Sequence, residues 1–257
     1  MNKKEGWLLE AQNVTKRFGS VTALSGVSFQ VGYAEVVGLL GDNGAGKSTL
    51  IKLLAGVHSQ DEGQLLWEGQ PVKLRSPQDA MKLGISTVYQ DLGLVDTINI
   101  YRNMFLGREE AICTEKGPIR FLQIGKARIK AKQALETTGI TIRSVDEAAA
   151  KLSGGERQSI AIARAIYFET KLLIMDEPCA ALGIKETDRV LKLIAKAKEN
   201  GVSVIIIAHN LHHVCPIADR FTILSHGKVV GTFIRGEKTM EELSECIVSG
   251  GTIESGV

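Results

Sequence analysis

The first part of the chain alternates short apolar runs with glycine turns. The apolar runs cover residues 7–14, 27–31 and 36–40. Runs of strand length between turn residues are typical of an antiparallel sheet. We therefore expect antiparallel strands in the first 40 residues, and short strands and turns again over residues 60–74.

The pattern changes at Gly41. The sequence GDNGAGKS follows a predicted strand and leads into TLIKLLAG, whose large apolar residues are spaced as on one face of a helix until Gly56. Residues 36–56 are therefore expected to form a strand, a glycine-rich loop and a helix.

The middle of the chain is expected to be mainly helical. A β-branched run over residues 85–88 predicts a strand, and beyond it the densest helical segment is 126–138, with a mixed segment over 97–108. Strand-like alternation is weak throughout this stretch. We expect a helical subdomain of about residues 91–160, inserted in a single domain that spans residues 1–257.

After Leu152, strands and amphipathic helices alternate. This order predicts right-handed βαβ units around a parallel sheet, followed by a hairpin. Thr239 and Glu242, three residues apart as in a capping box, predict a last helix. The expected helices cover 155–168, 185–199 and 211–218, the strands 171–175 and 202–208, and the hairpin strands 220–224 and 228–235.

Composition and charge exclude several classes of protein. The 257 residues are 44% hydrophobic and 23% charged, as in a globular domain, and 31 basic against 29 acidic residues give a formal net charge of +2. The interleaved charges offer no basic face for nucleic acid. No apolar run reaches the length of a membrane-spanning helix, and the N-terminal residues lack the apolar stretch of a cleaved signal.

Cysteine and histidine spacing does not suggest a metal site. The cysteines form no CxxC pair, which favours reduced thiols in a cytoplasmic protein. His212 and His213 lack a partner at metal-ligand spacing, so we interpret them as solvated helix residues. The four cysteines are Cys113, Cys179, Cys215 and Cys246.

Residues 41–48 match the phosphate-loop pattern G-x-x-x-x-G-K-[ST]. Its glycines let successive backbone N–H groups face phosphate oxygens at the positive end of the following helix. Lys47 is expected to reach the β- and γ-phosphates, and Ser48 to ligate Mg2+. A dinucleotide-binding fingerprint fails on spacing, because Thr49 stands where its third glycine belongs. The expected cofactors are ATP and Mg2+.

A second acidic anchor follows a buried strand. The run Leu-Leu-Ile-Met brings Asp176 to the carboxyl edge of a parallel sheet, where such sheets bind ligands. Asp176 is expected to hold the Mg2+ shell, and Glu177 to orient and deprotonate the water that attacks the γ-phosphate. The plainer alternative is a strand that ends in a solvated acidic turn.

Between these motifs lies LSGGERQ, residues 152–158, here called the signature segment. By itself it predicts a capped helix start, with Ser153 as cap and Glu156 three residues on. In this company it resembles the signature sequence of ATP-binding cassette (ABC) ATPases, and Ser153 stands 23 residues before Asp176, as in that family. The resemblance covers nearly the whole chain. It implies an α/β P-loop fold with a parallel core sheet, an N-terminal antiparallel β subdomain and an inserted helical subdomain.

The resemblance also implies roles for single residues. Phe18 matches the aromatic residue that stacks on adenine, for which a core position is the alternative. Gln90 matches the glutamine near Mg2+ and the attacking water, and His209 the histidine that contacts the γ-phosphate. The implied nucleotide site further comprises Gly41, Asp42, Asn43, Gly44, Ala45, Gly46, Lys47, Ser48, Thr49, Asp176 and Glu177.

In ABC proteins the signature segment contacts the γ-phosphate bound by the other subunit. Ser153, Gly154 and Gly155 are therefore expected to act on a second copy, with two chains arranged head to tail around two ATP molecules. The D-loop segment, residues 178–183, departs from the family: Gly183 stands where most members have Asp, and Cys179 where Thr is commonest. The missing carboxylate puts the usual contact across the dimer in question.

The resemblance implies the ATP-hydrolysing subunit of a bacterial ABC importer, bound to the cytoplasmic face of the inner membrane. Its expected partners are a second ATP-binding subunit, transmembrane permease subunits that dock near residues 97–108 and Gln90, and indirectly a periplasmic sugar-binding protein. The segments at 84–90, 103–108 and 177–183 are similar to those of monosaccharide importers of the ribose, xylose or fructose kind.

Two alternatives stay open. One is a transporter for amino acids, metals or lipids, because other subunits choose the cargo. The other is a soluble ABC ATPase that acts on ribosomes or DNA, although the chain has no basic stripe, second cassette or long coiled coil.

Overall fold

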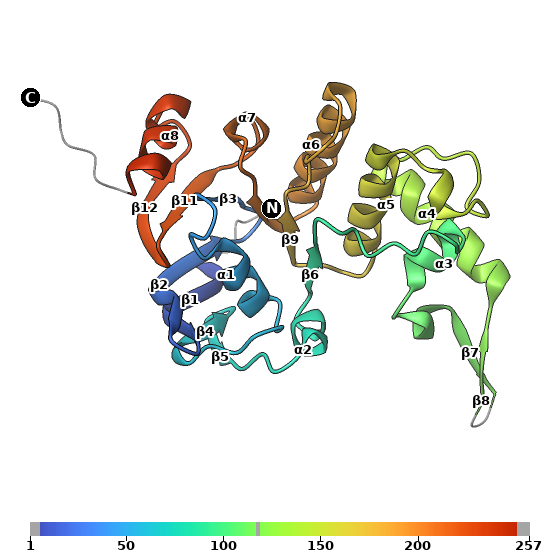
Figure 1. Cartoon of the computed structure of the whole chain (residues 1–257). Helices are drawn as coiled ribbons and strands as arrows, with labels where there is room; N and C mark the ends of the chain where they lie inside the picture. Colours follow the sequence, from blue (N-terminus) through green and yellow to red (C-terminus); the bar gives the residue numbers. More distant parts are fainter. Residues whose placement is uncertain (1–5, 117–118, 251–257) are drawn as a thin grey trace, which may run out of the picture.

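A six-stranded sheet forms the centre of the molecule (Figure 1). The computed structural model describes residues 6–116 and 119–250, so the two ends of the predicted 1–257 domain lie outside the described residues. The strand order is β12-β11-β3-β10-β9-β6, and every neighbouring pair is parallel except β11 and β12. The strands are β3 Val36–Leu40, β6 Ile85–Val88, β9 Leu172–Asp176, β10 Ser203–Ile207, β11 Arg220–Ser225 and β12 Lys228–Ile234.

Both faces of this sheet are covered, so its central strands are largely apolar, with polar residues only at the ends, Asp176 of β9 and Ser203 of β10. In β9, Leu172 and Ile174 pack in one buried cluster with the N-terminal sheet, whereas Leu173 and Met175 pack in another with the helices of the opposite side. Successive side chains of a strand point to opposite faces, which produces this division. Continuous apolar runs are the pattern of a parallel sheet buried on both sides.

A second, antiparallel sheet has the order β2-β1-β4-β5. The expectation of an antiparallel sheet near the N-terminus is thus confirmed for two of the three apolar runs. It is wrong for residues 36–40, because these five buried residues form β3, which pairs in parallel with β10 and β11. The strands are β1 Trp7–Phe18, β2 Val21–Gly32, β4 Glu62–Trp67 and β5 Gln70–Val72.

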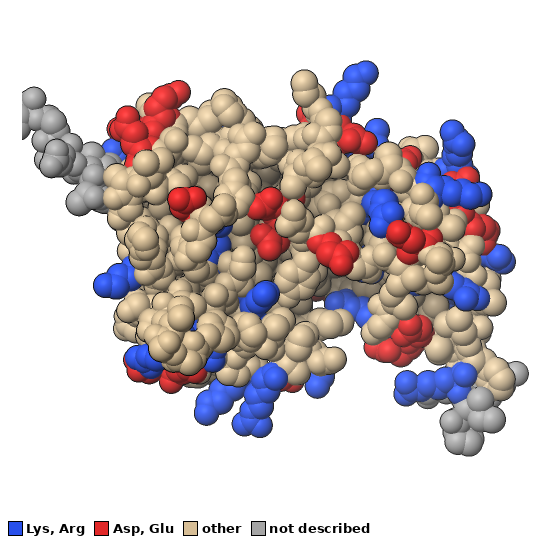
Figure 2. Space-filling view, in the orientation of Figure 1, with Lys and Arg blue, Asp and Glu red and all other residues tan. Residues whose placement is uncertain are grey.

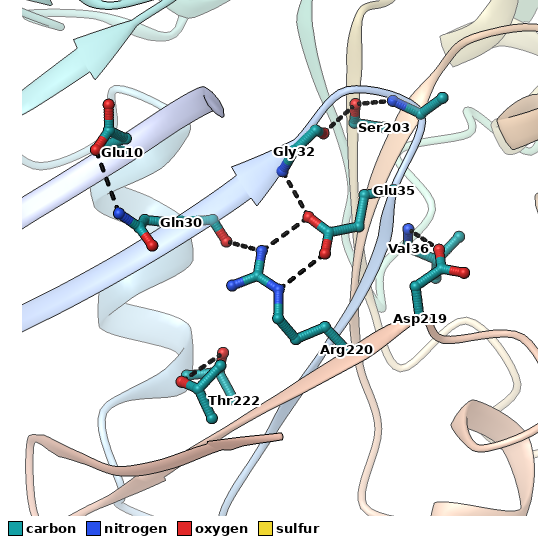
Figure 3. A network of polar contacts seen from close by, with 11 residues as sticks. Glu10, Gln30, Gly32, Glu35, Val36, Ser203, Asp219, Arg220 and Thr222 are labelled. Atoms are coloured by element: carbon teal, nitrogen blue, oxygen red, sulfur yellow. Dashed lines mark hydrogen bonds and ion pairs between the residues drawn. The ribbon is translucent and has the colours of Figure 1, made fainter. Parts of the chain in front are cut away.

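A polar network joins the two sheets (Figure 3). The Arg220 guanidinium makes two bonds to the Glu35 carboxylate, at 2.8 and 2.7 Å, and donates to the Gln30 carbonyl at 2.9 Å. The Ser203 hydroxyl donates to the Gly32 carbonyl at 2.8 Å. Bidentate arginine–carboxylate pairs fix orientation as well as distance. The network therefore holds the end of β2 against β10 and β11.

Among residues 6–116 and 119–250, five helices lie in the α/β part. The expected helix over 211–218 is shorter, because it ends at Val214 and Pro216 lacks the N–H that a further turn needs. The predicted last helix is confirmed, with the Thr239–Glu242 capping box formed. α2 has only six residues, too few for a clear helical pattern in the sequence, and was not among the predicted helices. The helices are α1 Lys47–Leu54, α2 Pro77–Lys82, α6 Ile184–Glu199, α7 Leu211–Val214 and α8 Met240–Ser249.

The helical insertion, defined here as residues 91–160, lies on the far side of the molecule from α1 (Figure 1). The predicted C-terminal boundary of the insertion, at about residue 160, falls inside α5. The expectation of little strand in this region is wrong, because β7 and β8 form a hairpin that extends from it. Each hairpin strand has only four residues, too few for a clear alternating pattern. The elements are α3 Ile100–Phe105, η1 Glu109–Ile112, β7 Cys113–Lys116, β8 Ile119–Leu122, α4 Ile124–Thr138, η2 Ala149–Lys151 and α5 Gly154–Tyr167.

Positive and negative side chains alternate over the surface shown in Figure 2, without a continuous basic area. In the described part of the chain, no helix is long and apolar enough to cross a membrane.

Candidate functional site

Three strand ends meet at one edge of the core sheet. β10 lies between β3 and β9, and its Ile207 pairs with Leu39 on one side and Asp176 on the other. The chain segments that follow these strands therefore leave the sheet side by side. They surround a pocket of about 410 Å³. Its lining residues are Val21, Thr22, Ala23, Asn43, Gly44, Ala45, Gly46, Lys47, Ser48, Thr49, Asp176, Glu177, Ile207, His209, His226 and Gly227.

The phosphate loop, residues 41–48, needs glycine at two positions for space as well as conformation. A Cβ on Gly41, at φ +143°, would lie 2.2 Å from the Leu224 carbonyl oxygen, and one on Gly46, at φ +105°, would lie 2.7 Å from the Ala23 carbonyl oxygen. Gly46 also caps α1 without a side-chain hydrogen bond, and the first turn has no acidic residue. The N–H groups of this turn thus have no side-chain acceptor, which suits an anion in the pocket.

Lys47 is the cation of the pocket and is only 6% exposed. Its Nζ donates to the carbonyl oxygens of Gly41 at 2.7 Å and Asp42 at 2.8 Å. Burial lowers the pKa of Lys47, and the carboxylates of Asp42, Glu177 and Asp176 oppose this effect. These bonds span the loop, so the ammonium group is held beside the N–H groups that face the pocket.

Asp176 and Glu177 bring two carboxylates to the opposite wall. Burial raises the pKa of Asp176, with a further contribution from the Glu177 carboxylate, while Lys47 and His209 oppose the shift. A carboxylate that is costly to ionise gains most from a nearby cation. Together with the Ser48 hydroxyl of the same pocket, Asp176 offers the hard oxygen ligands that Mg2+ prefers.

Glu177 is held in an uncommon backbone conformation. Its φ is +50°, and its N–H donates to the Ile207 carbonyl at 2.9 Å, which continues the contact between β9 and β10. Its Oε1 lies 2.9 Å from His209 Nε2. The positive φ turns the chain sharply after Asp176, so the two adjacent carboxylates can take different roles at the pocket.

Four residues predicted for the nucleotide site are not among those that line this pocket: Gly41 and Asp42, whose carbonyl oxygens accept from Lys47, and Phe18 and Gln90. Phe18 is 43% exposed and makes an edge-on contact with His58, with ring centres 5.2 Å apart, but it pairs with Val21, which does line the pocket. Gln90 is exposed and follows β6, whose Val88 pairs with Met175, so it leaves the same edge of the sheet as Asp176. Their predicted roles toward adenine and the attacking water stay predictions.

The signature segment also lies outside the pocket lining. Ser153 and Gly154 are exposed at the start of α5, and Gly155 is buried. The Ser153 hydroxyl accepts from the Glu156 N–H at 3.3 Å, while the Glu156 carboxylate accepts from the Ser153 N–H at 2.8 Å. The predicted capping box is thus confirmed, and the exposed helix start is available to a second molecule.

The D-loop segment, residues 178–183, joins the pocket to α6. Cys179 is buried, and burial raises the pKa of its thiol to about 11. Gly183 caps α6 with φ −72°, a value open to any residue. Neither Cys179 nor Gly183 lines the pocket.

Sequence reasoning missed part of the pocket wall. Thr22 and Ala23 come from β2, and His226 and Gly227 from the turn between β11 and β12. Gly227 accepts from the Ser25 N–H and donates to the Ala45 carbonyl, so the turn braces the phosphate loop. The sequence showed this turn only as a hairpin signal, because its contact with the phosphate loop is made across the fold.

Known proteins resemble the chain over most of its length. The ABC transporter family model matches residues 24–180. The chain is 45% identical to a xylose/arabinose import ATP-binding protein of Sulfolobus acidocaldarius, over 94% of both chains, and 43% identical to a fructose import ATP-binding protein of Rhizobium meliloti, over 86% of both. A crystal structure of a nucleotide-free ATP-binding cassette from an ABC transporter matches with a TM-score of 0.81 at 25% identity, covering 96% of this chain and 99% of that one.

These matches agree with the arrangement of the pocket. The family model covers both the phosphate loop and the two carboxylates, and the solved cassette confirms the expected α/β fold with a parallel core sheet, an antiparallel N-terminal sheet and helices. The chain belongs to the ABC transporter family of ATP-binding cassettes.

Proposed function

We propose that this chain is the ATP-hydrolysing subunit of an importer for a monosaccharide. The observation that carries the proposal is the convergence of Lys47, Asp176, Glu177 and His209 on one pocket at the edge of the core sheet. Relatives at 45% and 43% identity are named for xylose/arabinose and fructose import, which supports a pentose or hexose as cargo.

Each residue of the pocket has a separate role in ATP hydrolysis in this proposal. Lys47 and the N–H groups at the start of α1 bind the phosphate oxygens. Asp176 and the Ser48 hydroxyl would hold Mg2+, which neutralises developing charge on the phosphates when bound. Glu177 accepts the proton of the attacking water, and His209, 2.9 Å from it, orients the carboxylate and the γ-phosphate.

A second copy completes each site in this proposal. The exposed start of α5 lies outside the pocket of its own chain, yet its free hydroxyl hydrogen and helix N-terminus suit a phosphate. A head-to-tail pair of chains would bring it to the partner's ATP. A related solved cassette is described as dimeric, at 23% identity and a TM-score of 0.74.

The permease is expected to dock where the helical insertion meets the α/β part. A groove of about 550 Å³ opens there, lined by apolar and aromatic side chains and by charged side chains of both signs. It lies at the end of the predicted docking segment 97–108. Such a contact would place the chain on the cytoplasmic face of the membrane, with a periplasmic sugar-binding protein as an indirect partner. The groove residues include Met81, Lys82, Arg108, Tyr167 and Phe168.

Replacement of Glu177 by Gln tests the catalytic part of the proposal. The variant should bind ATP normally, lose turnover by about 10²–10⁴-fold and accumulate as an ATP-dependent dimer, because only the proton acceptor is removed. Glu136→Gln, an exposed carboxylate on α4, serves as the matched control with unchanged turnover. Normal hydrolysis by Glu177→Gln would remove Glu177 from the role of base.

The cargo needs a separate experiment. Cells that express the chain with the permease and binding protein encoded beside it should take up labelled xylose, arabinose, fructose or ribose. Uptake of amino acids, metals or lipids instead would reassign the cargo, and recovery of the chain with ribosomes would contradict the transport function.

A further inference from the structure

Gly183 is not required by its place in the fold. Its φ of −72° suits any residue, and an added Cβ would come no nearer than 3.8 Å to another atom, which is Glu186 Oε2. The glycine therefore removes a side chain that space and conformation would both allow. The nearest carboxylate in α6 belongs to Glu186, one helical turn further along.

Glu186 makes two contacts that link separate parts of the chain. Its Oε2 accepts from the Gly183 N–H at 3.2 Å, which caps α6. The Cβ, Cγ and Cδ of the same side chain lie over Gly155, where an added Cβ would fall 2.8–2.9 Å from all three. One side chain thus ties the end of the D-loop segment to the signature segment.

The other signature glycine, Gly154, also lies against the D-loop segment. An added Cβ on Gly154 would meet Leu182 Cδ2 at 3.6 Å, an ordinary packing distance. The two signature glycines therefore lie against Leu182, just before α6, and Glu186, in its first turn. Close approach of this kind transmits a displacement, because a packed surface has no room to absorb it.

The D-loop segment connects this contact to the catalytic carboxylate. Only five residues separate Glu177 from Gly183, and the Ala180 N–H donates to the Glu177 carbonyl at 3.1 Å. Ala181 holds a positive φ of +58°, and Cys179 is buried. The segment is a tight, anchored turn, so a shift at Gly183 moves the backbone that presents Glu177.

We propose that Glu186 is a positioning residue for ATP hydrolysis. This proposal rests on the proposed function. Its carboxylate holds the D-loop segment against the start of α5, so that Glu177 and the signature segment keep a fixed relation within one chain. Glu186 makes these contacts within one chain, so it does not restore the contact across the dimer that an Asp at position 183 would make. Its contact is internal, and its effect reaches the ATP of each site through the two segments it joins.

Paired variants of the full chain test this role. Glu186→Ala should lower kcat for MgATP about tenfold while ADP affinity stays within about twofold, because the phosphate loop is untouched. Glu186→Gln should keep at least half of the wild-type kcat, since an amide oxygen accepts the same hydrogen bond at nearly the same volume.

The capping box of α8 provides the control for plain helix capping. Glu242 Oε2 accepts from the Thr239 N–H at 2.7 Å, as Glu186 does from Gly183, but Glu242 does not line the pocket and touches neither the D-loop segment nor the signature segment in the hydrogen bonds of the described residues. Glu242→Ala should lower Tm about as much as Glu186→Ala and leave kcat unchanged. Equal kcat in the two alanine variants, or no rescue by Glu186→Gln, would overturn the positioning role. Absence of turnover in the unaltered chain would instead contradict the proposed function.

Discussion

The phosphate-binding edge of the core sheet and the helical insertion are positioned by different forces. At the sheet edge, parallel backbone pairing aligns the ends of β3, β10 and β9, so the fold sets the geometry of the pocket without help from any single side chain. The insertion is held by apolar packing, in a buried cluster that it shares with α6 and one face of the core sheet, and also by individual side-chain-to-backbone bonds. One such residue is Asn103, fully buried, which bonds to both the N–H and the carbonyl of Val95.

Arg164 in α5 is another of these connections. Its guanidinium donates to the carbonyl oxygens of Gly93 at 3.0 Å, Leu92 at 3.2 Å and Asn103 at 3.4 Å. Burial lowers its pKa, with a contribution from nearby Arg108, and no ion pair joins it to a carboxylate within the described residues. We therefore expect substitutions at the sheet edge to change the chemistry of the pocket and leave the fold intact, and substitutions in the insertion to change the stability and placement of that region.

The largest expected effect comes from the sheet edge. Lys47→Ala removes the buried cation beside the phosphate oxygens and should weaken ATP binding by at least about 100-fold, as loss of two charge-assisted hydrogen bonds implies. Lys52 is an exposed lysine on the same helix, so Lys52→Ala is the control that removes an equal charge. Isothermal titration with ATP measures both. Equal affinities of the two variants would contradict the assignment of the phosphate loop.

A substitution that loosens the insertion should lower stability and leave ATP affinity nearly unchanged. Arg164→Met removes three hydrogen bonds from a charged donor and should destabilise the insertion by roughly 2–4 kcal/mol, while ATP affinity changes less than about threefold. Hydrogen exchange should rise in residues 91–112 and stay unchanged in β3, β9 and β10. Lys132→Met, on the exposed face of α4, is the control. Uniform loss of protection from hydrogen exchange across the chain would show that the stability of the insertion is not independent of that of the core sheet.

A smaller effect is expected for stability at the pocket. Because the folded chain raises the pKa of Asp176, ionised Asp176 costs stability, and this cost grows as pH rises from the ordinary pKa of the unfolded chain to the higher pKa of the folded chain, above which it is fully present. Asp176→Asn should therefore raise Tm at pH 7 by a few degrees, since about 1 kcal/mol shifts Tm by about 2–4 °C at this size. The difference should vanish at acid pH. A lower Tm for Asp176→Asn at pH 7, measured without metal, would contradict the assigned cost of burial.

The sequence was sufficient for most of the core. Buried parallel strands are rich in apolar and β-branched residues, so 85–88, 171–175 and 202–208 could be recognised, and the glycine loop marked the turn into α1. The error at β3 arose because a short apolar run looks the same in either kind of sheet. Only its partners, β10 and β11, distinguish them.

The rest of the site could not be read from local pattern. His226 and Gly227 reach the pocket through a hairpin that packs on the phosphate loop, a contact between residues about 180 positions apart. The contact of Glu186 with Gly155 likewise joins two helix starts that are separate in sequence. Such contacts depend on the tertiary arrangement rather than on local propensity.

The central claim is that each catalytic site is shared between two copies of the chain. Lys47→Ala disables the phosphate loop, and Gly154→Asp puts a negative charge where the partner's γ-phosphate is expected, at a helix start that tolerates an acidic residue. Each variant alone should be inactive. A 1:1 mixture should recover about a quarter of wild-type turnover, because half of randomly formed twofold pairs have one intact composite site. A mixture as inactive as its components, or wild-type turnover by Gly154→Asp alone, would contradict the claim.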